Sequence, residues 1–94
     1  DCDSERYLAQ VDSVERNWKA AMARYTQAAA CYETAIARMQ KELSEHEKDI
    51  TGLSNGLIAT LRGDIKEAET LGASSTQNAA VAAANAGATM RHGG

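Results

Sequence analysis

Two cysteines, Cys2 and Cys31, have the spacing that says most about covalent chemistry in this chain. If both lie on one continuous helix they are about 43 Å apart, at 1.5 Å per residue, whereas a disulfide needs Cα atoms within about 7 Å. We therefore expect no bond between them within one chain. In an exported protein this spacing favours an intermolecular disulfide, with a modified Cys2 or free thiols as the alternatives.

A second group of residues with ligand chemistry surrounds the histidine at position 46. Glu42 precedes His46 by four residues and Asp49 follows it by three, so one helix face could offer a nitrogen and two carboxylates. Lysines alternate with these acids, which is more typical of a solvated helix face with pairs three and four residues apart. We therefore predict no metal site, no cofactor and no catalytic residue, and we expect that the chain is not an enzyme.

Composition bounds the class of protein that these residues belong to. The 94 residues include no proline and no phenylalanine, and 44% are apolar, many of them alanine, which favours a single all-α domain. The formal charge is −3 without a basic run, so we expect no nucleic-acid partner. No segment reaches the ~20 apolar residues of a membrane-spanning helix, so we also predict no transmembrane segment.

The apolar residues that must pack against something recur at alternating steps of four and three from Tyr7 to Leu57, with one stutter of four between Tyr32 and Ile36. This heptad spacing is typical of a coiled-coil seam, and it predicts one long helix over about 4–53. We expect the seam to be an interface with another helix. Its predicted interface residues are Val11, Val14, Trp18, Tyr25, Tyr32, Ile36, Met39, Leu43, Ile50, Leu53 and Leu57.

The strongest break in the sequence is Ser54-Asn55-Gly56, because Asn and Gly tolerate the conformations that end a helix. We predict a hairpin corner there, followed by a return arm broken at Gly72 into helices over about 57–71 and 75–90. In that register the alanine-rich residues 78–86 lie beside Tyr25 and Tyr32. The alternative is a straight rod. Residues 72–94 form an alanine-rich C-terminal segment that is uncharged as far as Met90.

Two functions fit a helical hairpin with an apolar seam, and no motif assigns the chain to a family. The first is a structural subunit that self-associates into a filament or coiled-coil bundle, its partners being copies of itself. The second is a soluble binding module, such as an export chaperone, an adaptor or a secreted ligand, which docks an amphipathic face on another helical protein. Because the sequence opens on Asp1, we expect a processed protein that is extracellular or periplasmic, with a cytoplasmic location as the alternative.

Overall fold

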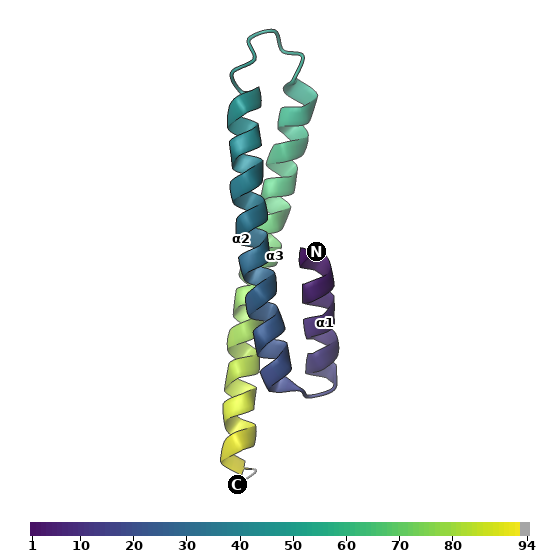
Figure 1. The fold of residues 1–94 in the computed structure, drawn as a ribbon, viewed down its shortest axis with the longest axis vertical. Coiled ribbons are helices and arrows are strands. Elements are labelled where there is room, and N and C mark those ends of the chain that lie inside the picture. Colours follow the sequence, from purple (N-terminus) through teal and green to yellow (C-terminus); the bar gives the residue numbers. More distant parts are fainter. Residues whose placement is uncertain (93–94) are drawn as a thin grey trace.

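The chain folds into a long helical hairpin with a third, shorter helix along one side (Figure 1). The computed structural model describes residues 1–92, of which 89–92 are described by their backbone only. Within this range the helices are α1 (Cys2–Val14), α2 (Trp18–His46) and α3 (Asn55–His92). The antiparallel α2 and α3 form the hairpin, and α1 folds back beside the N-terminal half of α2. The three helices together measure 66 × 16 × 14 Å. The prediction of an all-α hairpin is confirmed, and the straight rod is wrong.

The predicted helix over 4–53 is interrupted first between α1 and α2. Arg16 adopts a left-handed backbone conformation with φ of 63°. The amide of Arg16 donates to the Ser13 carbonyl at 3.0 Å, and the amide of Asn17 donates to the Asp12 carbonyl at 2.8 Å. This pair of hydrogen bonds is a Schellman motif, which satisfies the last carbonyls of a helix and reverses the chain. Glycine usually occupies the left-handed position at the end of a helix, but in this chain the residue is an arginine. The sequence therefore shows no signal that the helix ends there.

The second interruption is the hairpin corner, which spans residues 47–54. Gly52 has φ of +80°, a conformation that L side chains rarely adopt, and the amide of Ile58 donates to the Ser54 carbonyl at 2.9 Å as α3 begins. The predicted corner at Ser54–Gly56 is therefore about one helical turn too late. Asn55 and Gly56 belong to the first turn of α3.

The return arm is one continuous helix, so the predicted break at Gly72 is wrong. α3 keeps the alternating spacing of four and three along its whole buried face, but small side chains occupy most of that face after Ile65. Packing against α2 outweighs the modest cost of glycine in a helix. The buried or half-buried residues of this face are Ile58, Leu61, Ile65, Ala68, Gly72, Ser75, Ala79, Ala82 and Ala86.

Large rings of α2 pack against the small residues of α3. Tyr25 lies in a buried cluster with Ala82 and the half-buried Ala79, so the predicted pairing of Tyr25 with residues 78–86 is confirmed. Tyr32 instead packs against Ala68, and a Cβ built on Gly72 would lie 3.3 Å from the Tyr32 Cβ. The predicted pairing of Tyr32 with 78–86 is wrong because the corner comes a turn earlier and moves the register accordingly.

The closeness of the two helices at Gly72 leads to a first prediction. Gly72→Leu must push α3 away from Tyr32, and we expect a loss of about 1–3 kcal/mol in the free energy of unfolding. The matched control is Gly63→Leu, where nothing lies within 4 Å of the added Cβ and the better helix former should stabilise the chain by about 0.5–1 kcal/mol. Urea unfolding followed by circular dichroism measures both. Equal effects at the two glycines would contradict the close approach at Tyr32.

Candidate interaction surfaces

Cys2 and Cys31 form a disulfide within one chain, with their Cα atoms 5.4 Å apart. Neither cysteine is free. The expectation that the two cannot bond in one chain, and that they join neighbouring molecules, is therefore wrong. It followed from the assumption of a continuous helix, and the reversal at Arg16 brings Cys2 back beside Cys31.

Polar side chains also hold α1 on the hairpin. The Tyr32 hydroxyl donates a hydrogen bond to Asp3 and accepts one from Arg6 Nε at 3.2 Å. Burial and the hydrogen bond to Asp3 raise the pKa of Tyr32, which keeps the hydroxyl protonated as a donor. About two helical turns before Tyr32, Arg24 of α2 lies 3.0 Å from Asp12 and 4.0 Å from Glu5. Both of these acids belong to α1, so one arginine bridges the two helices.

The side of α1 that faces the hairpin is small and polar, while three of its larger apolar side chains are exposed to solvent. Of residues 2–14, Ala9 alone is buried. Tyr7 and Val14 are 63% and 84% exposed, and Leu8 is exposed as well. A helix that packs mainly through hydrophobic contacts shows the opposite distribution. The attachment of α1 therefore depends on the disulfide and the polar contacts more than on apolar burial.

The hairpin corner presents a second apolar surface. Ile50 is 99% exposed and Leu53 is 89% exposed, and Leu57 at the start of α3 is exposed beside them in sequence. The loop that carries them is held by hydrogen bonds. Asp49 accepts from the amide and hydroxyl of Thr51, at 2.9 and 2.6 Å, and from the amide of Ser54 at 3.1 Å. At the base of the corner, Arg62 of α3 donates to Glu47 at 2.9 Å.

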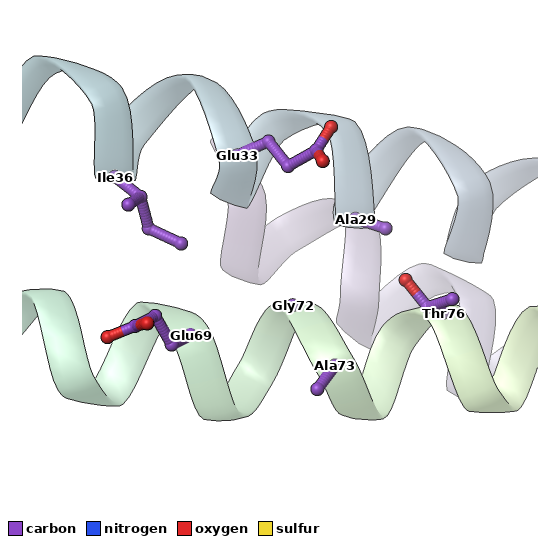
Figure 2. A pocket seen from close by; sticks show the side chains of 7 residues that line it. All are labelled: Ala29, Glu33, Ile36, Glu69, Gly72, Ala73 and Thr76. Atoms are coloured by element: carbon purple, nitrogen blue, oxygen red, sulfur yellow. The ribbon is translucent and has the colours of Figure 1, made fainter.

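A shallow groove runs between α2 and α3 on the side away from α1 (Figure 2). Glycine and alanine line the groove, so no large side chain fills it. The carboxylates of Glu33 and Glu69 flank it, one from each helix. The groove follows from the close helix approach at Gly72. Its lining residues are Ala29, Glu33, Ile36, Glu69, Gly72, Ala73 and Thr76.

The predicted interface residues differ in how deeply the structure buries them. Those of α2 pack toward α3 of the same chain, with Tyr25 and Tyr32 buried and Trp18, Ile36, Met39 and Leu43 half-buried. Val11 of α1 is half-buried. The others, Val14, Ile50, Leu53 and Leu57, lie outside the core. Their spacing continues the heptad, but the helix that would have aligned them is broken at 15–17 and 47–54.

The described part of the chain offers little other ligand chemistry. Among those residues no group of three or more His, Cys, Asp or Glu side chains could hold a metal ion. Asp49, which the sequence placed near His46, is engaged by Thr51 and Ser54 of the corner. No helix in the described range is long and apolar enough to span a membrane.

Comparison with known protein families, with curated proteins and with solved structures finds no significant match. The surfaces of the chain itself are therefore the basis for inferring its function.

The disulfide leads to a second prediction. Replacing both Cys2 and Cys31 by Ser removes a link between residues 29 apart, and we expect a loss of about 3–4 kcal/mol in the free energy of unfolding. Denaturant titration should give the same midpoint for this double variant and for the reduced wild-type chain. On a non-reducing gel the oxidised chain should run as one monomer band, and a ladder of larger species would contradict an intrachain bond.

The corner leads to a third prediction, which concerns pH. The hydroxyl and amide of Thr51 lower the pKa of Asp49 from 3.8 to about 2. Since the folded-state pKa is depressed, the contribution of Asp49 to stability is complete above pH 3.8 and is lost as the pH falls through about 2. Thr51→Ala should raise the pKa of Asp49 toward its ordinary value in a carbon-detected NMR titration. Thr60→Ala, which removes an exposed hydroxyl within α3, is the control and should leave it unchanged.

Proposed function

We propose that the chain is a non-enzymatic protein-binding module, a disulfide-linked helical hairpin that contacts its partners through residues outside its packed core. One observation carries the proposal: large apolar side chains are exposed in two groups, while alanine, glycine and serine fill much of the interior. Grouped exposed apolar residues mark interaction sites more often than scattered ones do. The groups are Tyr7, Leu8 and Val14 on α1, and Ile50, Leu53 and Leu57 at the corner.

The internal pairing of α2 with α3 supports a binding module over a filament built through the seam. Tyr25 and Tyr32 already pack against α3, so the central seam is occupied within each chain. The cysteines likewise bond to each other and are not available to link neighbours. A self-associating structural subunit stays as the second candidate because the elongated shape and the apolar corner could allow end-to-end contacts.

The disulfide also supports a location. Structural disulfides form and persist in oxidising compartments and are rare in the cytosol. The bond between Cys2 and Cys31 is one of the contacts that hold α1 on the hairpin, so the attachment of α1 depends in part on that bond. We therefore propose an extracellular or periplasmic location.

The fourth prediction separates the two candidate functions. A binding module should elute as a monomer near its chain mass of 10.0 kDa in light scattering, with and without reductant. A structural subunit should give large particles that grow with concentration. If particles form, Ile50→Ser with Leu53→Ser should disperse them when the corner is the contact, while Val81→Ser on the exposed side of α3 serves as the control.

Binding itself is tested by selecting helical peptides from a displayed library on the oxidised chain. Selected peptides should lose affinity for a variant of one exposed apolar group, either Tyr7→Ser with Val14→Ser or Ile50→Ser with Leu53→Ser. These positions are exposed, so each variant should keep the wild-type circular dichroism spectrum. A monomer that selects no peptide sensitive to either pair would overturn the proposed function.

A further inference from the structure

We propose that the Cys2–Cys31 disulfide is a redox switch, whose reduction by a dithiol releases α1 from the hairpin and lets residues 2–46 form one continuous helix. We call the folded-back arrangement of Figure 1 the closed form, and the arrangement with the continuous helix the open form. The inference goes beyond the proposed function, because it concerns the chain alone and needs no binding partner.

The disulfide makes the two forms mutually exclusive. In the closed form the Cα atoms of Cys2 and Cys31 are 5.4 Å apart, as the bond requires. In a continuous helix the same two residues, 29 positions apart, are separated by about 43 Å, so the bond cannot exist. The oxidised chain is therefore restricted to the closed form, and only the reduced chain can open.

The sequence around the reversal favours the open form. Arg16 has φ of 63°, a left-handed conformation that is unfavourable for a residue with a side chain. Residues 14–18 contain neither glycine nor proline, and the apolar spacing continues across them from Val14 to Trp18. The local sequence and the tertiary contacts thus prefer different backbone conformations, which makes this segment a two-state element.

Apart from the disulfide, α1 is held mainly by polar contacts. Ala9 is the one buried residue of 2–14, and the ion pairs of α1 reach Arg24, whose side chain is 40% exposed. Exposed ion pairs contribute little to stability, and a disulfide between residues 29 apart contributes more. The hairpin itself packs through other contacts, such as that of Tyr32 with Ala68 and Gly72. Reduction therefore weakens the attachment of α1 and leaves the hairpin in place.

A thiol can reach the bond in the folded chain. Cys2 and Cys31 are both half-buried, and a surface cavity of about 430 Å³ opens beside them. A thiolate that enters this cavity meets the cysteines without prior unfolding, and access of this kind is one of the factors that set the rate of exchange. The other residues that line the cavity are Asp1, Thr34, Ala35 and Arg38.

The exchange balances with a dithiol as the co-reactant. One thiolate of the dithiol attacks a sulfur of the bond, forms a mixed disulfide and expels the other cysteine as a thiolate. The second thiolate of the dithiol then displaces the first cysteine. Two electrons and two protons pass to Cys2 and Cys31, which become thiols, and the dithiol becomes a disulfide. In an oxidising compartment the closed form is the resting state, and a dithiol opens it.

Opening rearranges the apolar surface of the chain. On a continuous helix Tyr7 and Val14 lie on the same face as Trp18, so the apolar seam of α2 extends without interruption into α1. The departure of α1 also uncovers part of the cluster in which Ala9 packs with Tyr25. The reduced chain therefore presents a longer apolar seam than the oxidised chain does.

NMR spectroscopy of the full chain before and after reduction tests the switch, because Tyr32 contacts both neighbouring helices. We expect reduction to abolish the NOEs from Tyr32 to Arg6 of α1 and to preserve those from Tyr32 to Gly72 of α3. Helical NOEs from Arg16 to Lys19, which the left-handed backbone of the closed form does not allow, should appear. Reoxidation should restore the original pattern.

Two substitutions of Arg16 form a matched pair. Arg16→Gly accepts the left-handed conformation freely and disfavours a helix interior, whereas Arg16→Ala has the opposite preferences. We expect the ratio of open to closed form in the reduced chain to be at least about tenfold higher for Arg16→Ala than for Arg16→Gly. Both variants should stay closed when oxidised.

Four results would each overturn the inference. The first is a reduced chain that keeps the NOEs between Tyr32 and Arg6, because α1 then stays docked. The second is loss of the NOEs between Tyr32 and Gly72 as well, which indicates general unfolding. The third is release of α1 without helical NOEs from Arg16 to Lys19, and the fourth is an equal ratio for the two Arg16 variants. None of these results bears on the proposed function, which peptide selection on the oxidised chain tests separately.

Discussion

All three helices meet at the side chain of Tyr32, and the rest of the arrangement depends on that contact. Its ring packs against Ala68 and close to Gly72 of α3, which fixes the separation and the register of the hairpin. Its hydroxyl reaches Asp3 and Arg6 of α1. Its neighbour in sequence, Cys31, carries the disulfide to Cys2. A single residue of α2 therefore sets where both other helices lie.

The large ring at this point explains why α3 is rich in small residues. Toward the corner, where two helices pack without α1, Leu61 and Ile65 are buried and the half-buried Met39 and Leu43 come from α2. Beside α1 the interior must accommodate a third helix and the two tyrosine rings, and Gly72, Ser75 and Ala82 leave room for them. Close packing of side chains requires that a large residue on one helix be matched by a small one opposite. The small residues at the buried and half-buried positions of 72–86 are thus a packing requirement of α3.

Much of the fold could be predicted from the sequence, because the periodicity of the apolar residues indicates which face of a helix is buried. The heptad spacing correctly gave an all-α hairpin and the packing of Tyr25 against the alanines of α3. The break between α1 and α2 could not be found in the same way, since Arg16 takes a position that glycine usually marks and the apolar spacing runs through it unchanged. The continuity of α3 could not be predicted either, because there the sequence shows a stop signal that the structure does not use. Gly72 looks like a stop signal, and only its place against Tyr32 shows that it is a contact.

The reversal of the chain at Arg16 decides both where the disulfide forms and which way α1 faces. On a continuous helix, Tyr7, Val11 and Val14 join the same face as Trp18 and Tyr25, and the disulfide must reach another molecule. Once α1 reverses at Arg16, the disulfide closes within the chain, Tyr7 and Val14 are exposed, and Val11 between them is half-buried. The apolar spacing of α1 is therefore not accounted for by the fold of this chain. Exposed apolar residues at helical spacing are a feature that the proposed function, a protein-binding module, would account for.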